Sequence, residues 1–162
     1  MVFKKIINDP YNVVDEMVDG IVLAHHDILK FANNNKRAVV RKDAPVKDKV
    51  GILIGGGSGH EPAFVGYVGK GLADGAAIGN VFASPAPDPV VDATKAINGG
   101  KGVVYMYGNY AGDIMNFDMA AELCAAEDIT VKTILVTDDI ASAPLEKKKE
   151  RRGVAGDFYV FK

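Results

Sequence analysis

The chain has 162 residues, of which 48% are hydrophobic and 25% are charged, which is typical of one soluble globular domain. Its net charge of −2 gives no electrostatic basis for nucleic acid as the main partner, and no apolar run approaches the roughly 20 residues that span a bilayer. The single cysteine, Cys124, excludes an internal disulfide and is interpreted as a small buried residue, so a cytoplasmic protein without a membrane segment is expected.

The amino-terminal part of the chain predicts two helical segments. Asp9 and Pro10 are typical of a helix start, and residues 13–22 place apolar side chains at helical spacing. A second helical segment is expected over residues 28–31, ending near the three asparagines at 33–35.

Short strands and helices alternate along the rest of the chain. We expect strands over residues 38–40, 51–54, 76–78, 103–106, 131–136 and 158–161, and helices from Pro62, over 88–97 and over 115–126. This alternation predicts an α/β fold: one domain over residues 1–162, with a mixed or mainly parallel sheet and helices on both faces. Ligands of such sheets bind beyond the carboxyl ends of the strands, which places His60 and Asp113 at one edge.

Residues 55–62 read Gly-Gly-Gly-Ser-Gly-His-Glu-Pro and come directly after a predicted strand. With so few side chains, backbone N–H groups can approach a ligand closely. The segment matches neither the P-loop nor the dinucleotide pattern, because it has no lysine and position 60 is histidine. A small polar ligand, uncharged or singly phosphorylated, is therefore expected in place of a nucleotide.

His60 and Asp113 are the candidate titratable groups. A neutral histidine can act as a general base or orient a hydroxyl, with Glu61 as a candidate orienting group, although a lone histidine is more often simply hydrogen-bonded. Asp113 begins a helical stretch, where capping of backbone N–H groups is an equally adequate explanation. His25 and His26 are interpreted as surface residues, since adjacent histidines cannot easily bind one ion, and no metal site is expected.

Several segments together resemble the dihydroxyacetone-binding part of dihydroxyacetone kinases. These segments are residues 55–62, 82–85 (Phe-Ala-Ser-Pro), 109–117 (Asn-Tyr-Ala-Gly-Asp-Ile-Met-Asn-Phe) and 151–156 (Arg-Arg-Gly-Val-Ala-Gly). They occur in the same order as in the family. The resemblance covers nearly the whole chain and implies a ketone-binding domain, the amino-terminal part of a longer architecture, usually in a homodimer. It implies that Gly57, Ser58, Gly59, His60 and Asp113 bind the triose, and that His60 and Asp113 have acid/base roles.

The resemblance also implies partners. No cofactor is expected on this chain; the phosphoryl donor, ADP or ATP with magnesium, is expected on a separate nucleotide-carrying subunit or a fused domain. In the bacterial form a phosphoprotein of the phosphotransferase system takes part. The leading hypothesis is thus the triose-binding subunit of a dihydroxyacetone (glycerone) kinase in glycerol metabolism, with these 162 residues alone expected to be inactive.

Two departures from the family pattern keep a second hypothesis open. Family members capture the ketone covalently through a histidine in their second half, whereas this chain has only His25, His26 and His60. They also commonly carry a lysine where this chain has Gly108. The alternative is a kinase-like dihydroxyacetone sensor or transcriptional co-activator that transfers no phosphate.

Overall fold

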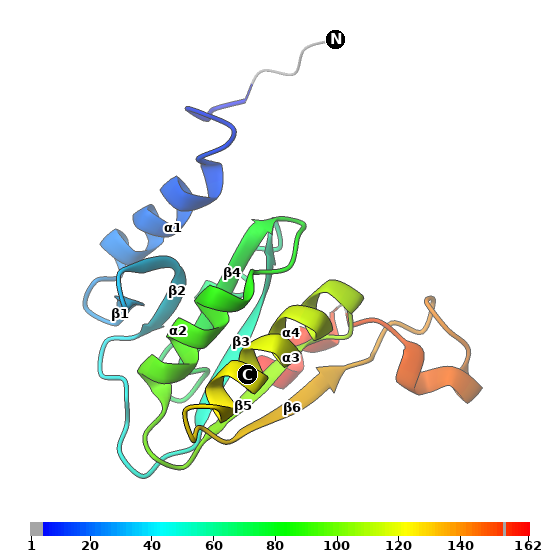
Figure 1. The fold of residues 1–162 in the computed structure, drawn as a ribbon. Helices are drawn as coiled ribbons and strands as arrows, with labels where there is room; N and C mark the ends of the chain where they lie inside the picture. The colour runs from blue at the N-terminus through cyan, green and yellow to red at the C-terminus, as the bar shows by residue number, and fades with distance from the viewer. Residues whose placement is uncertain (1–4, 154) are drawn as a thin grey trace.

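A mixed six-stranded sheet forms the centre of the computed structural model, which describes residues 5–153 and 155–162 (Figure 1). In the spatial order β1-β2-β4-β3-β5-β6, the last four strands are parallel to one another, while β2 runs antiparallel to both β1 and β4. The strands are β1 (Leu29–Ala32), β2 (Asn35–Arg41), β3 (Gly51–Ser58), β4 (Gly75–Val81), β5 (Val103–Gly108) and β6 (Val131–Val136). The expected mixed, mainly parallel sheet is confirmed.

Helices cover both faces of this sheet, as expected (Figure 1). They are α1 (Val13–Ala24), α2 (Pro87–Ile97), α3 (Ala111–Ala125) and α4 (Gly156–Phe161), with the short 3-10 helices η1 (Val65–Tyr67) and η2 (Leu145–Glu150). On one face α2 and α3 bury Val90, Phe117 and Cys124. On the other, α1 and α4 contribute Val18 and Phe161 to a second core. The buried position predicted for the cysteine is confirmed.

The helix expected over residues 28–31 is not formed, because this segment belongs largely to β1. β1 and β2 are joined by a two-residue turn, Asn33 and Asn34, with φ angles of 48° and 59°. Asparagine tolerates this left-handed conformation better than most residues, and two such residues in succession typically close a hairpin. Leu29 and Ala32 are buried in the sheet. The asparagines thus mark a hairpin turn and not a helix end.

The strand expected over residues 158–161 is also wrong, since these residues lie in α4. Phe161 is buried, whereas Phe158 and Tyr159 are exposed. The rings of Phe158 and Phe161 each lie 5.9 Å from the ring of Tyr67, which fits side chains three residues apart on one side of a helix. An apolar run this short does not distinguish a strand from a helix in sequence.

The glycines at 55–57 lie within β3 and not in a loop after it. A Cβ atom on Gly55 would lie 2.5 Å from the carbonyl oxygen of Ala77, and one on Gly56 would lie 2.3 Å from the Phe64 ring. These distances are shorter than any van der Waals contact permits. The absence of side chains here therefore permits close packing on both faces of the strand.

The helix starts differ in detail from those expected. α1 begins at Val13, after a turn in which the Asp9 carboxylate accepts the backbone N–H of Tyr11. α2 and α3 begin earlier in the chain than expected. The helix expected from Pro62 is not formed, and only the single turn η1 follows it.

Gly79 in β4 is expected to tolerate no side chain. A Cβ atom there would lie 1.9 Å from the carbonyl oxygen of Ala83 and 2.8 Å from the backbone nitrogen of Pro85. Because both are backbone atoms, we predict that Gly79→Ala lowers the free energy of unfolding by about 1–3 kcal/mol or more. Gly20 in α1 has nothing within 4 Å of the same position, so Gly20→Ala should instead stabilise, by roughly 0.5–1 kcal/mol. Urea unfolding of both variants checks this, and equal midpoints would contradict it.

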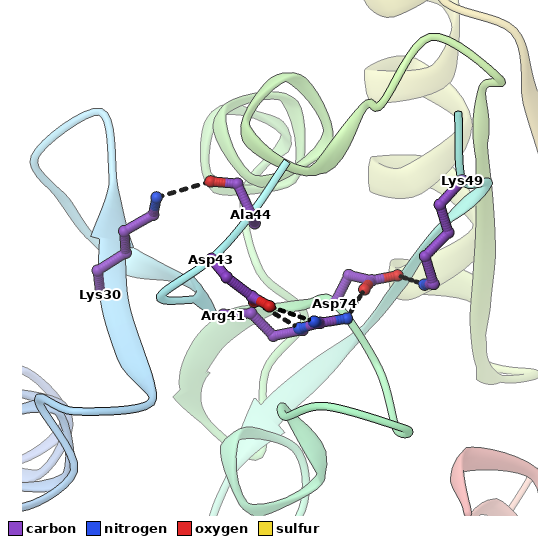
Figure 2. Close-up of polar contacts among 6 residues, drawn as sticks. All are labelled: Lys30, Arg41, Asp43, Ala44, Lys49 and Asp74. Carbon is purple, nitrogen blue, oxygen red and sulfur yellow. Dashed lines mark hydrogen bonds and ion pairs between the residues drawn. The ribbon is translucent and has the colours of Figure 1, made fainter. Parts of the chain in front are cut away.

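An ion-pair network with a buried centre lies at the edge of the sheet where β3 and β4 begin (Figure 2). Arg41 donates to Asp74 at 2.7 Å and to the two carboxylate oxygens of Asp43 at 2.9 and 2.6 Å. Asp74 also pairs with Lys49 and accepts the backbone N–H of Ile52 at 2.8 Å. Arg41 and Asp74 are only 5% and 3% exposed. The network therefore ties the end of β2 to the starts of β3 and β4.

Candidate functional site

A cavity of about 220 Å³ lies at the carboxyl ends of β3 and β5. The chain leaves β3 toward η1 on one face of the sheet and leaves β5 toward α3 on the other. This reversal opens a crevice between neighbouring strand ends, the usual ligand position in such sheets. Residues 55–57 of β3 and Gly108 of β5 line it. The cavity thus borders two backbone segments that carry no side chains.

The structure brings His60 and Asp113 together at this cavity. His60 enters from the turn after β3, and Asp113 from the first turn of α3. Burial raises the pKa of Asp113, and the Ser84 hydroxyl and the nearby His60 lower it in part. The two side chains therefore share one electrostatic environment despite their separation in sequence.

Asp113 does not cap α3. Tyr110 occupies the N-cap position, and no side chain makes a capping hydrogen bond to this helix. Among the described residues, Asp113 Oδ1 is buried with no hydrogen-bond partner. Leaving a buried acceptor unpaired costs about 1–3 kcal/mol. Helix capping does not account for this carboxyl, and a ligand that donates a hydrogen bond would.

His60 is positioned by packing and not by a carboxylate. Its ring lies edge-on to Phe82, with 5.2 Å between the ring centroids. Glu61, the candidate orienting group, instead accepts the backbone N–H of Gly59 with both carboxylate oxygens, at 3.1 and 3.0 Å. The ring nitrogens of His60 make no hydrogen bond within the described part of the chain. They are therefore available to a ligand.

Of the other residues implied to bind the triose, Gly57 lines the cavity. The Ser58 hydroxyl is buried and donates to the Gly79 carbonyl oxygen at 2.8 Å. Gly59, with a φ of 101°, directs its N–H to Glu61. Ser58 and Gly59 thus lie beside the cavity, and their part in ligand binding stays a prediction.

Asp157 is a cavity residue that the sequence analysis missed. It lies in the first turn of α4 and lines both this cavity and an adjoining one of about 390 Å³. Burial raises the pKa of Asp157 to about 7, with further contributions from the charges of Asp138 and Asp113. Its only signal in sequence is an acidic residue directly after the motif at 151–156. Nothing there connects it with position 113.

The raised pKa of Asp157 predicts a pH-dependent stability. Unfolding returns the carboxyl to its ordinary pKa of about 4, so between about pH 4 and 7 the folded chain binds more protons than the unfolded one. This carboxyl therefore destabilises the fold as the pH rises through that interval. We predict that Asp157→Asn is more stable than the unmodified protein at pH 8 by about 1–2 kcal/mol, allowing for solvent screening, with little difference near pH 4. Urea unfolding at both pH values tests this; an equal difference at each would contradict it.

The cavity offers no cationic side chain to a ligand. Its lining residues include two carboxyls, Asp113 and Asp157, but no lysine or arginine. Within the described residues, no cluster of three or more histidine, cysteine or acidic side chains could hold a metal ion, and no helix is long and apolar enough to span a membrane. His25 and His26 are exposed at the end of α1. The lining therefore suits a neutral ligand rich in hydrogen-bond donors better than a nucleotide phosphate.

Comparison with known proteins finds a match to the Dak1 domain over residues 19–162. The chain is 54% identical over 159 residues to the dihydroxyacetone-binding subunit DhaK of PTS-dependent dihydroxyacetone kinase 2 from Listeria innocua, covering 98% of this chain and 47% of that protein. It is 45% identical to an L-erythrulose kinase from Pectobacterium atrosepticum, covering 97% of this chain and 26% of that one. The chain thus spans about half the length, or less, of these relatives.

Solved structures also match most of this chain. The native dihydroxyacetone kinase of C. freundii matches with a TM-score of 0.88 and 37% identity over 99% of this chain and 29% of that one. The dihydroxyacetone kinase operon co-activator Dha-DhaQ matches with a TM-score of 0.81 and 34% identity over 91% of this chain and 45% of its own.

Proposed function

The chain belongs to the Dak1 domain family, and on this premise we propose that it is the dihydroxyacetone-binding part of a dihydroxyacetone (glycerone) kinase. The observation that supports this best is the placement of His60 and Asp113 at one cavity, with the Asp113 Oδ1 lacking a hydrogen-bond partner among the described residues. A ketose supplies hydroxyl donors for that oxygen and carries no charge that the two carboxyls would repel.

In the proposed reaction, Asp113 accepts the proton of a terminal hydroxyl of the ketone. The hydroxyl oxygen attacks the phosphoryl group of a donor held by a partner, the new O–P bond forms, and the bond to the donor breaks. Burial raises the pKa of Asp113, which makes the ionised carboxylate a stronger base toward that hydroxyl. His60 hydrogen-bonds the ketone and helps to hold it beside Asp113. Positioning of the hydroxyl oxygen relative to the phosphoryl group supplies much of the rate.

The proposed partners are a nucleotide-bearing subunit and a phosphoprotein of the phosphotransferase system. The second partner is supported by the names of two relatives, which are described as subunits of PTS-dependent kinases. ADP or ATP with magnesium would bind to that subunit and not to this chain, because the cavity lining has no cationic side chain for phosphate. The proposal includes a homodimer in the cytoplasm.

A second candidate is a dihydroxyacetone sensor that transfers no phosphate. It is favoured by the likeness to the operon co-activator and by Gly108, which brings no ammonium group to the site. The two functions differ in their products. The native-length protein is mixed with dihydroxyacetone and the nucleotide-bearing subunit, and triose phosphate and the intact protein mass are followed. Triose phosphate supports the kinase; ketone binding without product supports the sensor; and no binding contradicts both.

A further inference from the structure

Two carboxyls from different helices line the same cavity, and each has a buried oxygen without a hydrogen-bond partner among the described residues. Among the described residues, three buried side-chain nitrogen or oxygen atoms lack a hydrogen-bond partner, and two of them are Asp113 Oδ1 and Asp157 Oδ1. Asp113 comes from α3 and Asp157 from α4, and the charge of Asp113 adds to the effects of burial and of Asp138 in raising the pKa of Asp157. Of these two carboxyls, the proposed function assigns a role only to Asp113. Asp157 has none so far.

Asp157 lines the cavity, and its Oδ1 has no hydrogen-bond partner among the described residues. Gly108 lies beside it: a Cβ atom there would be 3.3 Å from Asp157 Oδ2 and 3.2 Å from the Tyr110 ring, so position 108 contributes no side chain to this space. No ion pair among the described residues includes Asp157. The nearby Arg152 instead lies 3.9 Å from Asp139 and over the Tyr110 ring.

We propose that Asp157 is a second substrate-binding residue, which accepts a hydrogen bond from the terminal hydroxyl of the ketose that lies farther from Asp113. This inference rests on the proposed function and deepens it. A ketose with a hydroxyl at each end donates one to each carboxyl, so both buried oxygens gain a partner. The hydroxyl at Asp113 is then the one that reacts, and the hydroxyl at Asp157 fixes the orientation of the molecule. A carboxylate at that end also disfavours ligands with an anionic group there.

A matched pair of ligands isolates this contact. Dihydroxyacetone has two terminal hydroxyls, whereas hydroxyacetone has one. At pH 8, Asp157→Ala in the native-length protein is expected to weaken dihydroxyacetone binding roughly 10- to 100-fold, the effect of losing one hydrogen bond to a charged acceptor. Hydroxyacetone can still donate its single hydroxyl to Asp113, so its affinity should change by no more than about threefold. Titration calorimetry with each ketone measures both constants.

Two control variants make the result decisive. Asp157→Asn keeps the size of the side chain and one acceptor oxygen. It should therefore weaken dihydroxyacetone binding more than hydroxyacetone binding, by a smaller factor than the alanine variant. It replaces the alanine variant in the test if that variant does not fold. Asp118→Ala removes an exposed carboxyl of α3 outside the cavity and should change neither affinity. Equal loss for both ketones, or no loss for dihydroxyacetone, overturns the inference. If the unmodified protein binds no dihydroxyacetone, both the inference and the proposed function are overturned.

Discussion

Asp113→Asn is expected to lower the rate of triose phosphate formation by about 10²- to 10⁴-fold, the usual contribution of a general base. The amide keeps the shape of the cavity but cannot accept the proton of the attacking hydroxyl. It can still hydrogen-bond the ketone, so the loss should appear in kcat with little change in ketone affinity. The measurement is a coupled assay of triose phosphate with the nucleotide-bearing partner at saturating dihydroxyacetone.

The same substitution separates catalysis from folding. Asp113 Oδ1 has no hydrogen-bond partner among the described residues, so losing the charge removes no protein contact at that atom and should not lower the free energy of unfolding. His60→Ala should also reduce product, with a weaker ketone affinity as its signature. Asp118→Asn, on the same helix but exposed, is the control and should keep full activity. Activity of Asp113→Asn within threefold of the unmodified protein would exclude it as the base.

The placement of His60 and Asp113 at one cavity could be predicted because it depends on a general rule of parallel sheets. Both residues follow strands of the parallel part of the sheet, and the carboxyl ends of parallel strands meet at one edge. The buried face of α1 could be predicted equally well, since its buried valines recur at helical spacing. These predictions needed only local patterns and one topological rule.

Asp157 could not be predicted because its place depends on how the end of the chain folds back. Residues 158–161 read as a strand, and only as helix α4 do they bring position 157 beside Gly108. The hairpin at Asn33 was missed for a related reason: apolar spacing alone does not separate a short helix from a short strand. Tertiary packing determines the secondary structure of both segments. Neither segment is long enough for its apolar pattern to distinguish a helix from a strand.

Asp74→Ala is expected to lower the free energy of unfolding by about 3–5 kcal/mol, the usual effect of removing one partner from a buried ion pair. Asp74 is 3% exposed and joins Arg41, Lys49 and the backbone N–H of Ile52 (Figure 2). Its loss leaves the buried Arg41 guanidinium with Asp43 alone and leaves the Ile52 N–H unpaired at the start of β3. Urea unfolding at neutral pH measures the change.

The matched control is Asp43→Ala, which removes the other carboxyl bound to Arg41. The Asp43 side chain is 59% exposed, compared with 4% for Asp74, so water can replace its contacts and the loss of stability should be clearly smaller. The network lies at the edge of the sheet away from the cavity, so folded Asp74→Ala protein should retain its ketone affinity. Equal destabilisation by the two substitutions would mean that burial of Asp74 does not set its contribution. Loss of ketone binding in the folded variant would mean that the two edges of the sheet are coupled.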